Sequence, residues 1–130
     1  MTKSWTIIAG AYGFIAVALG AFAAHGLQDA VSERSLNAVH TGAAYALTHA
    51  VALLALAAIG ARSGRLITFA GWAFTVGVAL FSGSLFVFGL TDFSTAIGPL
   101  PLITPLGGVL LLIGWALVFA AGLAGARRTD

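Results

Sequence analysis

The fold is decided by an uncharged run of 25 residues, LITFAGWAFTVGVALFSGSLFVFGL, at positions 66–90. A bilayer core about 30 Å thick needs about 20 helical residues at a rise of 1.5 Å per residue, so this run is long enough to cross a membrane. Three more stretches without Asp, Glu, Lys or Arg fill most of the remaining chain, at residues 5–24, 38–60 and 105–126. The sequence therefore predicts an all-α integral membrane bundle of four transmembrane helices, a single domain over residues 1–130.

The composition supports a membrane protein and excludes several other classes. The chain is 60% hydrophobic and 8% charged, whereas soluble domains carry about 25% charged residues. Its net charge is only +2 and its basic residues are scattered, which argues against a nucleic-acid partner. Cysteine is absent, so disulfides, thiolate metal sites and cysteine nucleophiles are excluded.

The basic residues predict the orientation of the chain. With four spans, the N-terminus, the middle loop and the C-terminus share one side, and five basic residues fall there: Lys3, Arg62, Arg65, Arg127 and Arg128. The other side holds only Arg34. Because basic loops stay in the cytoplasm, we expect both termini to be cytoplasmic. The first span is also an expected membrane helix and not a cleaved signal, since its apolar run of about 20 residues exceeds the usual 7–15.

Small and aromatic residues predict how the helices pack. Gly13, Gly20 and Gly71 belong to small-residue stripes, which allow close helix contact within a membrane. A ridge of Phe74, Phe81 and Phe88 on the third span can meet lipid, a partner protein or the bundle. The polar segment 27–37 fits either a short amphipathic surface helix or a solvated loop, and the sequence leaves both open.

His49 is the strongest candidate for chemistry, because it lies in the middle of the second span and titrates near neutral pH. An ionisable group within the membrane is a functional candidate. The alternative, which we favour, is a structural histidine bonded to a hydroxyl on a neighbouring helix. An unsatisfied polar group in hydrocarbon costs several kcal/mol, so we predict that His49 faces the interior and bonds Ser82 or Ser84.

The candidate lining of a ligand site or polar network is thus Tyr45, His49, Ser82 and Ser84. His25 and His40 can meet at the outer surface beside Asp29 or Glu33 and hold a metal; we predict neither a metal site nor a cofactor. The Ser82-Gly83-Ser84 motif lacks the strand-to-helix setting of a nucleophile elbow, and no other catalytic motif is present, so we do not expect an enzyme.

Several short motifs, in order, resemble one protein family, domain-of-unknown-function family 423. They are Gly20 to Leu27, Thr41 to Tyr45 with His49-Ala50, Leu80 to Leu85, Pro105 to Gly108, and Gly114-Trp115. The family comprises small bacterial inner-membrane proteins with a mitochondrial counterpart. This chain departs from its pattern at Ala23, where glycine is expected, and at Ala46, where glutamine often follows the tyrosine. The resemblance implies four membrane helices in the bacterial inner membrane and no particular activity.

These observations predict a structural or accessory component of a membrane assembly. The spans lack the charged groups needed for ion coupling, and the loops are too short to form a catalytic domain. The expected partners are membrane lipid and a membrane-protein partner or a second copy of the chain. The alternative is a transporter or binder of a small apolar or weakly polar molecule, with its site around His49.

Overall fold

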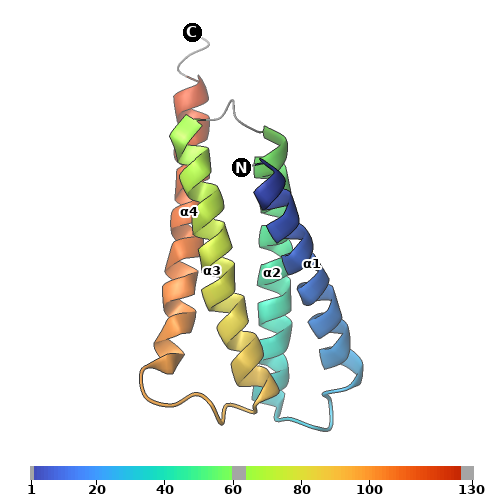
Figure 1. Cartoon of the computed structure of the whole chain (residues 1–130). Helices are drawn as coiled ribbons and strands as arrows, with labels where there is room; N and C mark the ends of the chain where they lie inside the picture. The colour runs from blue at the N-terminus through green and yellow to red at the C-terminus, as the bar shows by residue number, and fades with distance from the viewer. Residues whose placement is uncertain (1, 60–63, 127–130) are drawn as a thin grey trace.

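A computed structural model describes residues 2–59 and 64–126, and it is helical almost throughout (Figure 1). The helices are α1 (Thr2–His25), α2 (Glu33–Ile59), α3 (Gly64–Leu90) and α4 (Ile103–Ala126), and a short 3₁₀ turn, η2 (Leu100–Leu102), precedes α4. All four α-helices are long and apolar enough to cross a membrane. The predicted all-α architecture is confirmed.

The helices pack in chain order, with α2 and α3 at the centre (Figure 1). α1 packs on α2, and α4 packs on α3. Within the described residues, α1 and α4 share no packed interface. Burial follows this order: 44% and 39% of the apolar windows of α2 and α3 are buried, against 17% for each flanking helix. The bundle is therefore open, and its two outer helices each have a covered and an uncovered side.

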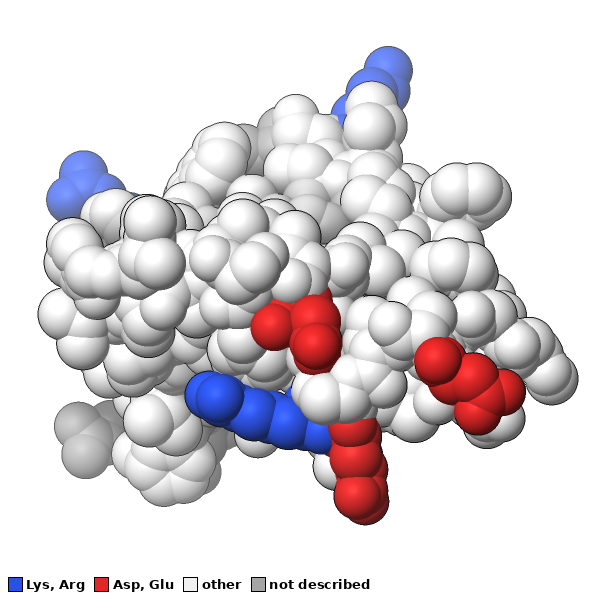
Figure 2. Space-filling model, turned by 90° about the horizontal axis from the view of Figure 1, so that it is seen from below, with Lys and Arg blue, Asp and Glu red and all other residues white. Residues whose placement is uncertain are grey.

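The two ends of the molecule differ in charge. The end formed by the α1–α2 and α3–α4 loops carries the described acidic residues, with one arginine among them (Figure 2): Asp29, Glu33, Asp92 and Arg34. Lys3 and Arg65 lie at the opposite end. We call these the acidic end and the basic end. The other basic residues used to predict orientation, Arg62, Arg127 and Arg128, lie outside the described residues.

The segment 27–37 is neither of the two structures considered from the sequence. Residues 27–31 form turns, and α2 already begins at Glu33, five residues before the predicted span. Ser32 caps α2, because its Oγ accepts a hydrogen bond from the backbone N–H of Ser35 at 3.3 Å; such caps satisfy free N–H groups in the first turn.

Asp92 from the α3–α4 loop closes over this helix start. One of its carboxylate oxygens accepts hydrogen bonds from the Ser32 hydroxyl at 2.6 Å, the Ser35 hydroxyl at 2.5 Å and the Ser32 N–H at 3.1 Å. The pKa of Asp92 lies below its usual value because these hydrogen bonds stabilise the carboxylate. The largest contribution comes from the Ser32 hydroxyl, followed by the Ser35 hydroxyl and the Ser32 N–H. The contact ties the two loops of the acidic end together.

The three glycines predicted at helix contacts lie there. A Cβ on Gly71 would come within 2.4 Å of the Trp5 ring, and Cβ atoms on Gly20 and Gly13 would meet Ala43 at 3.6 Å and Ala50 at 4.0 Å. Trp5 is consequently only 3% exposed. Its indole packs between α1 and α3 and is covered by the chain itself.

The phenylalanine ridge of α3 is used inside the chain. Phe74 and Phe88 are buried and Phe81 is half-buried, so the ridge offers little surface to a partner. Glycines on α4 make room for the Phe74 ring and for the α3 backbone at Phe81. A Cβ at Gly114 would come within 2.5 Å of Phe74, and one at Gly107 within 2.4 Å of the Phe81 backbone nitrogen. Because α4 lies so close to α3, a side chain of α4 can reach past α3 and contact α2.

Candidate functional site

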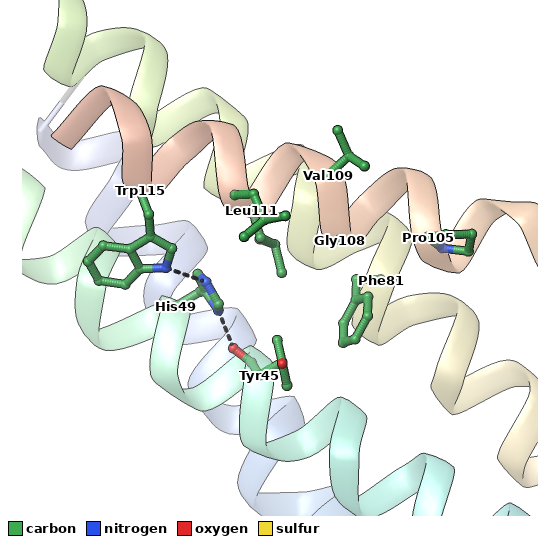
Figure 3. Close-up of a pocket in the computed structure, with 9 residues that line it drawn as sticks. Tyr45, His49, Phe81, Pro105, Gly108, Val109, Leu111 and Trp115 are labelled. Atoms are coloured by element: carbon green, nitrogen blue, oxygen red, sulfur yellow. Dashed lines mark hydrogen bonds between the residues drawn. The ribbon is translucent and has the colours of Figure 1, made fainter. Parts of the chain in front are cut away.

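His49 bridges α2 and α4 at mid-helix (Figure 3). Its Nδ1 lies 2.7 Å from the carbonyl oxygen of Tyr45, one turn earlier, and its Nε2 lies 3.1 Å from Trp115 Nε1. A carbonyl only accepts and an indole N–H only donates. The partners therefore require a neutral imidazole with the proton on Nδ1, and both ring nitrogens are satisfied.

The prediction that His49 faces the interior is confirmed, because its side chain is only 4% exposed. The predicted hydrogen-bond partner, Ser82 or Ser84, is wrong. The α3 ring beside His49 is Phe74, at 5.2 Å between centroids. Ser82 lies eight residues further along α3, about 12 Å at helical rise, and Ser84 further still. Phe74 occupies the level at which a serine was expected, and Trp115 supplies the hydrogen bond instead of a hydroxyl.

The two serines belong to other parts of the packing. Ser84 lies 2.6 Å from the hydroxyl of Thr104 on α4, and its own hydroxyl donates to the Phe81 carbonyl at 2.9 Å. Ser82 is buried, and its hydroxyl has no hydrogen-bond partner among the described residues. Of the four candidate site residues, the structure therefore brings together Tyr45 and His49 and leaves Ser82 and Ser84 apart.

Tyr45 and His49 line a groove of about 500 Å³ between α2 and α4 (Figure 3). We call it the Tyr45 groove; its lining is Tyr45, His49, Phe81, Pro105, Gly108, Val109, Leu111, Leu112 and Trp115. Phe81 comes from α3 and the last six residues from α4. Leu112 is 71% exposed and Trp115 46%, so the groove opens on the side of the helices, where a membrane protein meets lipid.

Aromatic rings form much of the wall. The Tyr45 and Phe81 rings lie 4.6 Å apart, and the Trp115 ring lies 5.1 Å from Phe74 and 6.0 Å from His49. These separations are typical of favourable aromatic pairs, about 4.5–7 Å between centroids. The rings are tilted against one another, by 41° for Tyr45–Phe81 and 59° for both Trp115 pairs, and they form a largely apolar wall of ring faces and edges.

The Tyr45 hydroxyl is the free polar group of this groove. The side chain is 44% exposed, and no hydrogen-bond partner for its hydroxyl occurs within the described residues. The other polar side-chain atoms of the lining, those of His49 and Trp115, bond as described above. The groove therefore presents one phenolic donor in an apolar setting.

His25 and His40 do not form a metal centre with the residues expected beside them. Both are exposed, and the part of the chain that the structure describes contains no group of three or more His, Asp or Glu side chains able to hold a metal ion.

Sequence reasoning missed Trp115, although a signal for it exists. Indoles usually lie at the membrane interface, and Trp115 lies in the middle of the fourth span, at the depth of His49. An indole N–H at that depth needs an acceptor, and the imidazole nitrogen of His49 is the matching group.

Fold and site together define a small four-span helical membrane protein with short loops and a groove in its lipid-facing side. A family model described as "Protein of unknown function (DUF423)" matches residues 19–108. The UPF0382 membrane protein YwdK of Bacillus subtilis is 37% identical over 123 residues, covering 93% of this chain and 97% of the relative. The chain belongs to this DUF423/UPF0382 family of membrane proteins.

Two further relatives have the same extent. A UPF0382 membrane protein of Haemophilus influenzae is 36% identical, covering 88% of this chain and 90% of its own length. UPF0382 membrane protein SAB0533 of Staphylococcus aureus is 36% identical, covering 92% and 94%. No solved structure matches the chain. The predicted family is confirmed, and with it a multi-pass membrane protein.

Proposed function

We propose that this protein is a non-catalytic membrane binder that holds a hydrophobic molecule in the Tyr45 groove. The observation that carries the proposal is an unpaired hydroxyl in an apolar groove that opens toward lipid. A polar group left without a partner in hydrocarbon is costly, and a bound molecule that accepts its hydrogen bond removes the cost. The volume of about 500 Å³ falls within the usual range of small-molecule sites, about 300–1,000 Å³.

Binding fits the geometry better than transport. The groove runs along α4 from Pro105 to Trp115, about 15 Å at helical rise, which is half of a bilayer core of about 30 Å. His49, the ionisable group beside it, already uses both nitrogens in hydrogen bonds within the chain. The role of His49 in this proposal is to position Trp115 as one wall of the groove.

Leu112→Trp tests the proposal, because this exposed residue lines the groove and a larger side chain fills it. Ile113→Trp is the matched control, since Ile113 is the next residue of α4, is exposed and lies outside the lining. Both variants are extracted in mild detergent and compared with the unmodified protein by native mass spectrometry.

We expect the unmodified protein and Ile113→Trp to retain a small molecule of the same mass, and Leu112→Trp to lose it. Equal retention by the two variants would place the molecule elsewhere on the surface. Absence of any retained molecule from the unmodified protein, including after incubation with total membrane lipid, would refute the proposal.

A structural or accessory role in a membrane assembly is the second candidate. Its support is the open packing order, which leaves one side of α1 and one side of α4 uncovered and exposes Phe14 and Phe119. These sides fit a transmembrane helix of a partner protein. The same mass spectra separate the two candidates, because a protein subunit adds kilodaltons whereas a groove ligand adds hundreds of daltons.

We also propose that both termini are cytoplasmic and that the protein lies in the bacterial inner membrane. The support is the charge difference between the ends, with Lys3 and Arg65 at the basic end and the described acidic residues at the other. Basic loops remain on the cytoplasmic side, so the acidic end would face outward.

A further inference from the structure

We propose that the molecule bound in the Tyr45 groove is a lipid-soluble quinone: a flat ring bearing carbonyl oxygens, with an apolar tail. This inference rests on the proposed binding function and names the ligand class. Three features of the groove lead to it: its hydrogen-bonding capacity, the shape of its walls and its depth in the membrane.

The free hydrogen-bonding group of the groove is a donor, so the ligand needs a hydrogen-bond acceptor. His49 and Trp115 satisfy each other, at 3.1 Å between Nε2 and Nε1, and neither serine of the motif at 82–84 is part of the lining. The Tyr45 hydroxyl is left as the group that a ligand meets. A ring carbonyl accepts one hydrogen bond from it and carries no donor that would itself remain unpaired.

The aromatic rings that line the groove favour a ligand with a flat ring. The Tyr45 and Phe81 ring centroids lie 4.6 Å apart, and the Trp115 indole lies on the side of His49 opposite to Phe81 (Figure 3). Aromatic faces and edges pack well on another planar ring. The exposed apolar residues of α4, Val109 and Leu112, continue the groove as a surface for an apolar tail.

The depth separates a quinone from a phospholipid. Tyr45 lies seven residues inside the uncharged span 38–60, about 10 Å at helical rise, and so within about 6 Å of the middle of the span. The ester carbonyls of a phospholipid lie at the edge of the hydrocarbon core, about 15 Å from its centre. A quinone ring is neutral and free of a headgroup, so its carbonyl can reach this depth.

Decylubiquinone, a benzoquinone with a ten-carbon chain, tests the assignment. Binding is measured in nanodiscs by saturable quenching of tryptophan fluorescence, because Trp115 lines the groove. A Trp72→Phe background removes the exposed indole that lies outside the groove. Dodecylbenzene, which has a ring and a tail but no carbonyl, is the matched ligand, and its binding is read as displacement of the quinone.

Tyr45→Phe removes the hydroxyl and keeps the ring, and we expect it to raise the Kd for decylubiquinone roughly five- to tenfold. Tyr12→Phe is the control, since the Tyr12 hydroxyl donates to the Thr75 carbonyl at 2.6 Å, outside the groove. It should leave the Kd unchanged. The affinity for dodecylbenzene should be the same in both variants and in the unmodified protein.

Each other outcome has a definite meaning. Saturable quenching that is insensitive to Tyr45→Phe overturns the quinone assignment and leaves groove binding in place. No saturable quenching, together with a small molecule retained by the unmodified protein and lost in Leu112→Trp, overturns the ligand class alone. Failure of both experiments overturns the proposed function as well.

Discussion

Replacing Trp115 with phenylalanine should destabilise the protein by about 1–1.7 kcal/mol. The change keeps an aromatic ring over Phe74 and removes the N–H that reaches His49 Nε2 at 3.1 Å. Interhelical hydrogen bonds in membranes contribute about 0.6 kcal/mol on average and up to about 1.7. Because His49 is 4% exposed, its nitrogen finds no replacement donor, and an unpaired buried acceptor costs about 1–3 kcal/mol. The expected loss lies where these two ranges overlap.

Trp72→Phe is a matched control for this substitution. Trp72 is 47% exposed and Trp115 46%, so both changes remove a similar amount of contact with lipid. No hydrogen bond from the Trp72 indole is found in the described part of the chain, and the control should change the free energy of unfolding by less than about 0.5 kcal/mol. Reversible unfolding in mixed micelles, followed by circular dichroism, measures both values.

A double-mutant cycle isolates the hydrogen bond from the loss of ring contacts. We expect Trp115→Phe and His49→Leu to be non-additive by about 1 kcal/mol, since either change alone breaks the same bond. His49→Gln should retain more stability than His49→Leu, because an amide can still donate to the Tyr45 carbonyl and accept from Trp115. Additive effects, or equal losses in Trp115→Phe and Trp72→Phe, would show that the bridge does not stabilise the fold.

Three further predictions follow from the packing, the acidic end and the charge distribution. Gly107→Ala should lower the free energy of unfolding by about 1–3 kcal/mol, because its Cβ would press on the α3 backbone at 2.4 Å, whereas Gly10→Ala, with open space around it, should be neutral in the same unfolding assay. Asp92 has a folded-state pKa below its unfolded value, so its stabilising effect is present above the unfolded pKa of about 3.9 and is lost as pH falls through the folded pKa. An unfolding midpoint recorded from pH 7 to pH 2 should fall more steeply for the unmodified protein than for Asp92→Asn, and parallel curves would contradict this. Thr95→Cys should react with a membrane-impermeant thiol reagent added outside the cell and Ser63→Cys should not; the reverse pattern would invert the proposed orientation.

The four helices were predictable from the sequence because hydrocarbon leaves the backbone few alternatives. A run such as residues 66–90 has to satisfy its own N–H and C=O groups, and only a helix does so within one segment. The ends of the helices were less predictable. α2 begins at Glu33 instead of residue 38 because Ser32 caps it and Asp92, 60 residues away, adds a carboxylate. A contact between two loops produces no periodic pattern in the sequence of either loop, so it cannot be predicted from such a pattern.

The candidate site was predictable in part, for a related reason. The depth of His49 along its own helix follows from counting residues, and so does its need for a partner. The identity of that partner depends on how far α4 approaches α2 across α3. That distance is set by Gly107, which admits the α3 backbone at Phe81, and by Gly114, which admits the Phe74 ring. Small-residue stripes indicate that helices approach closely. They do not indicate which residue of the neighbouring helix lies at the same depth as His49.

The hydrogen-bonded state of His49 determines what the groove can recognise. With its proton on Nδ1, His49 holds the Trp115 indole by accepting from it at Nε2. A second proton, on Nε2, would set two N–H donors against each other and release the indole, so the bridge exists only with a neutral imidazole. In that state neither ring offers a hydrogen bond to a ligand, and their combined effect is a fixed apolar wall. In the proposed binder, recognition of a polar group would then depend on Tyr45, one turn away on the same helix. The histidine that the sequence marks as the candidate for chemistry thus shapes the groove, and the neighbouring tyrosine is the residue through which it would distinguish one hydrophobic molecule from another.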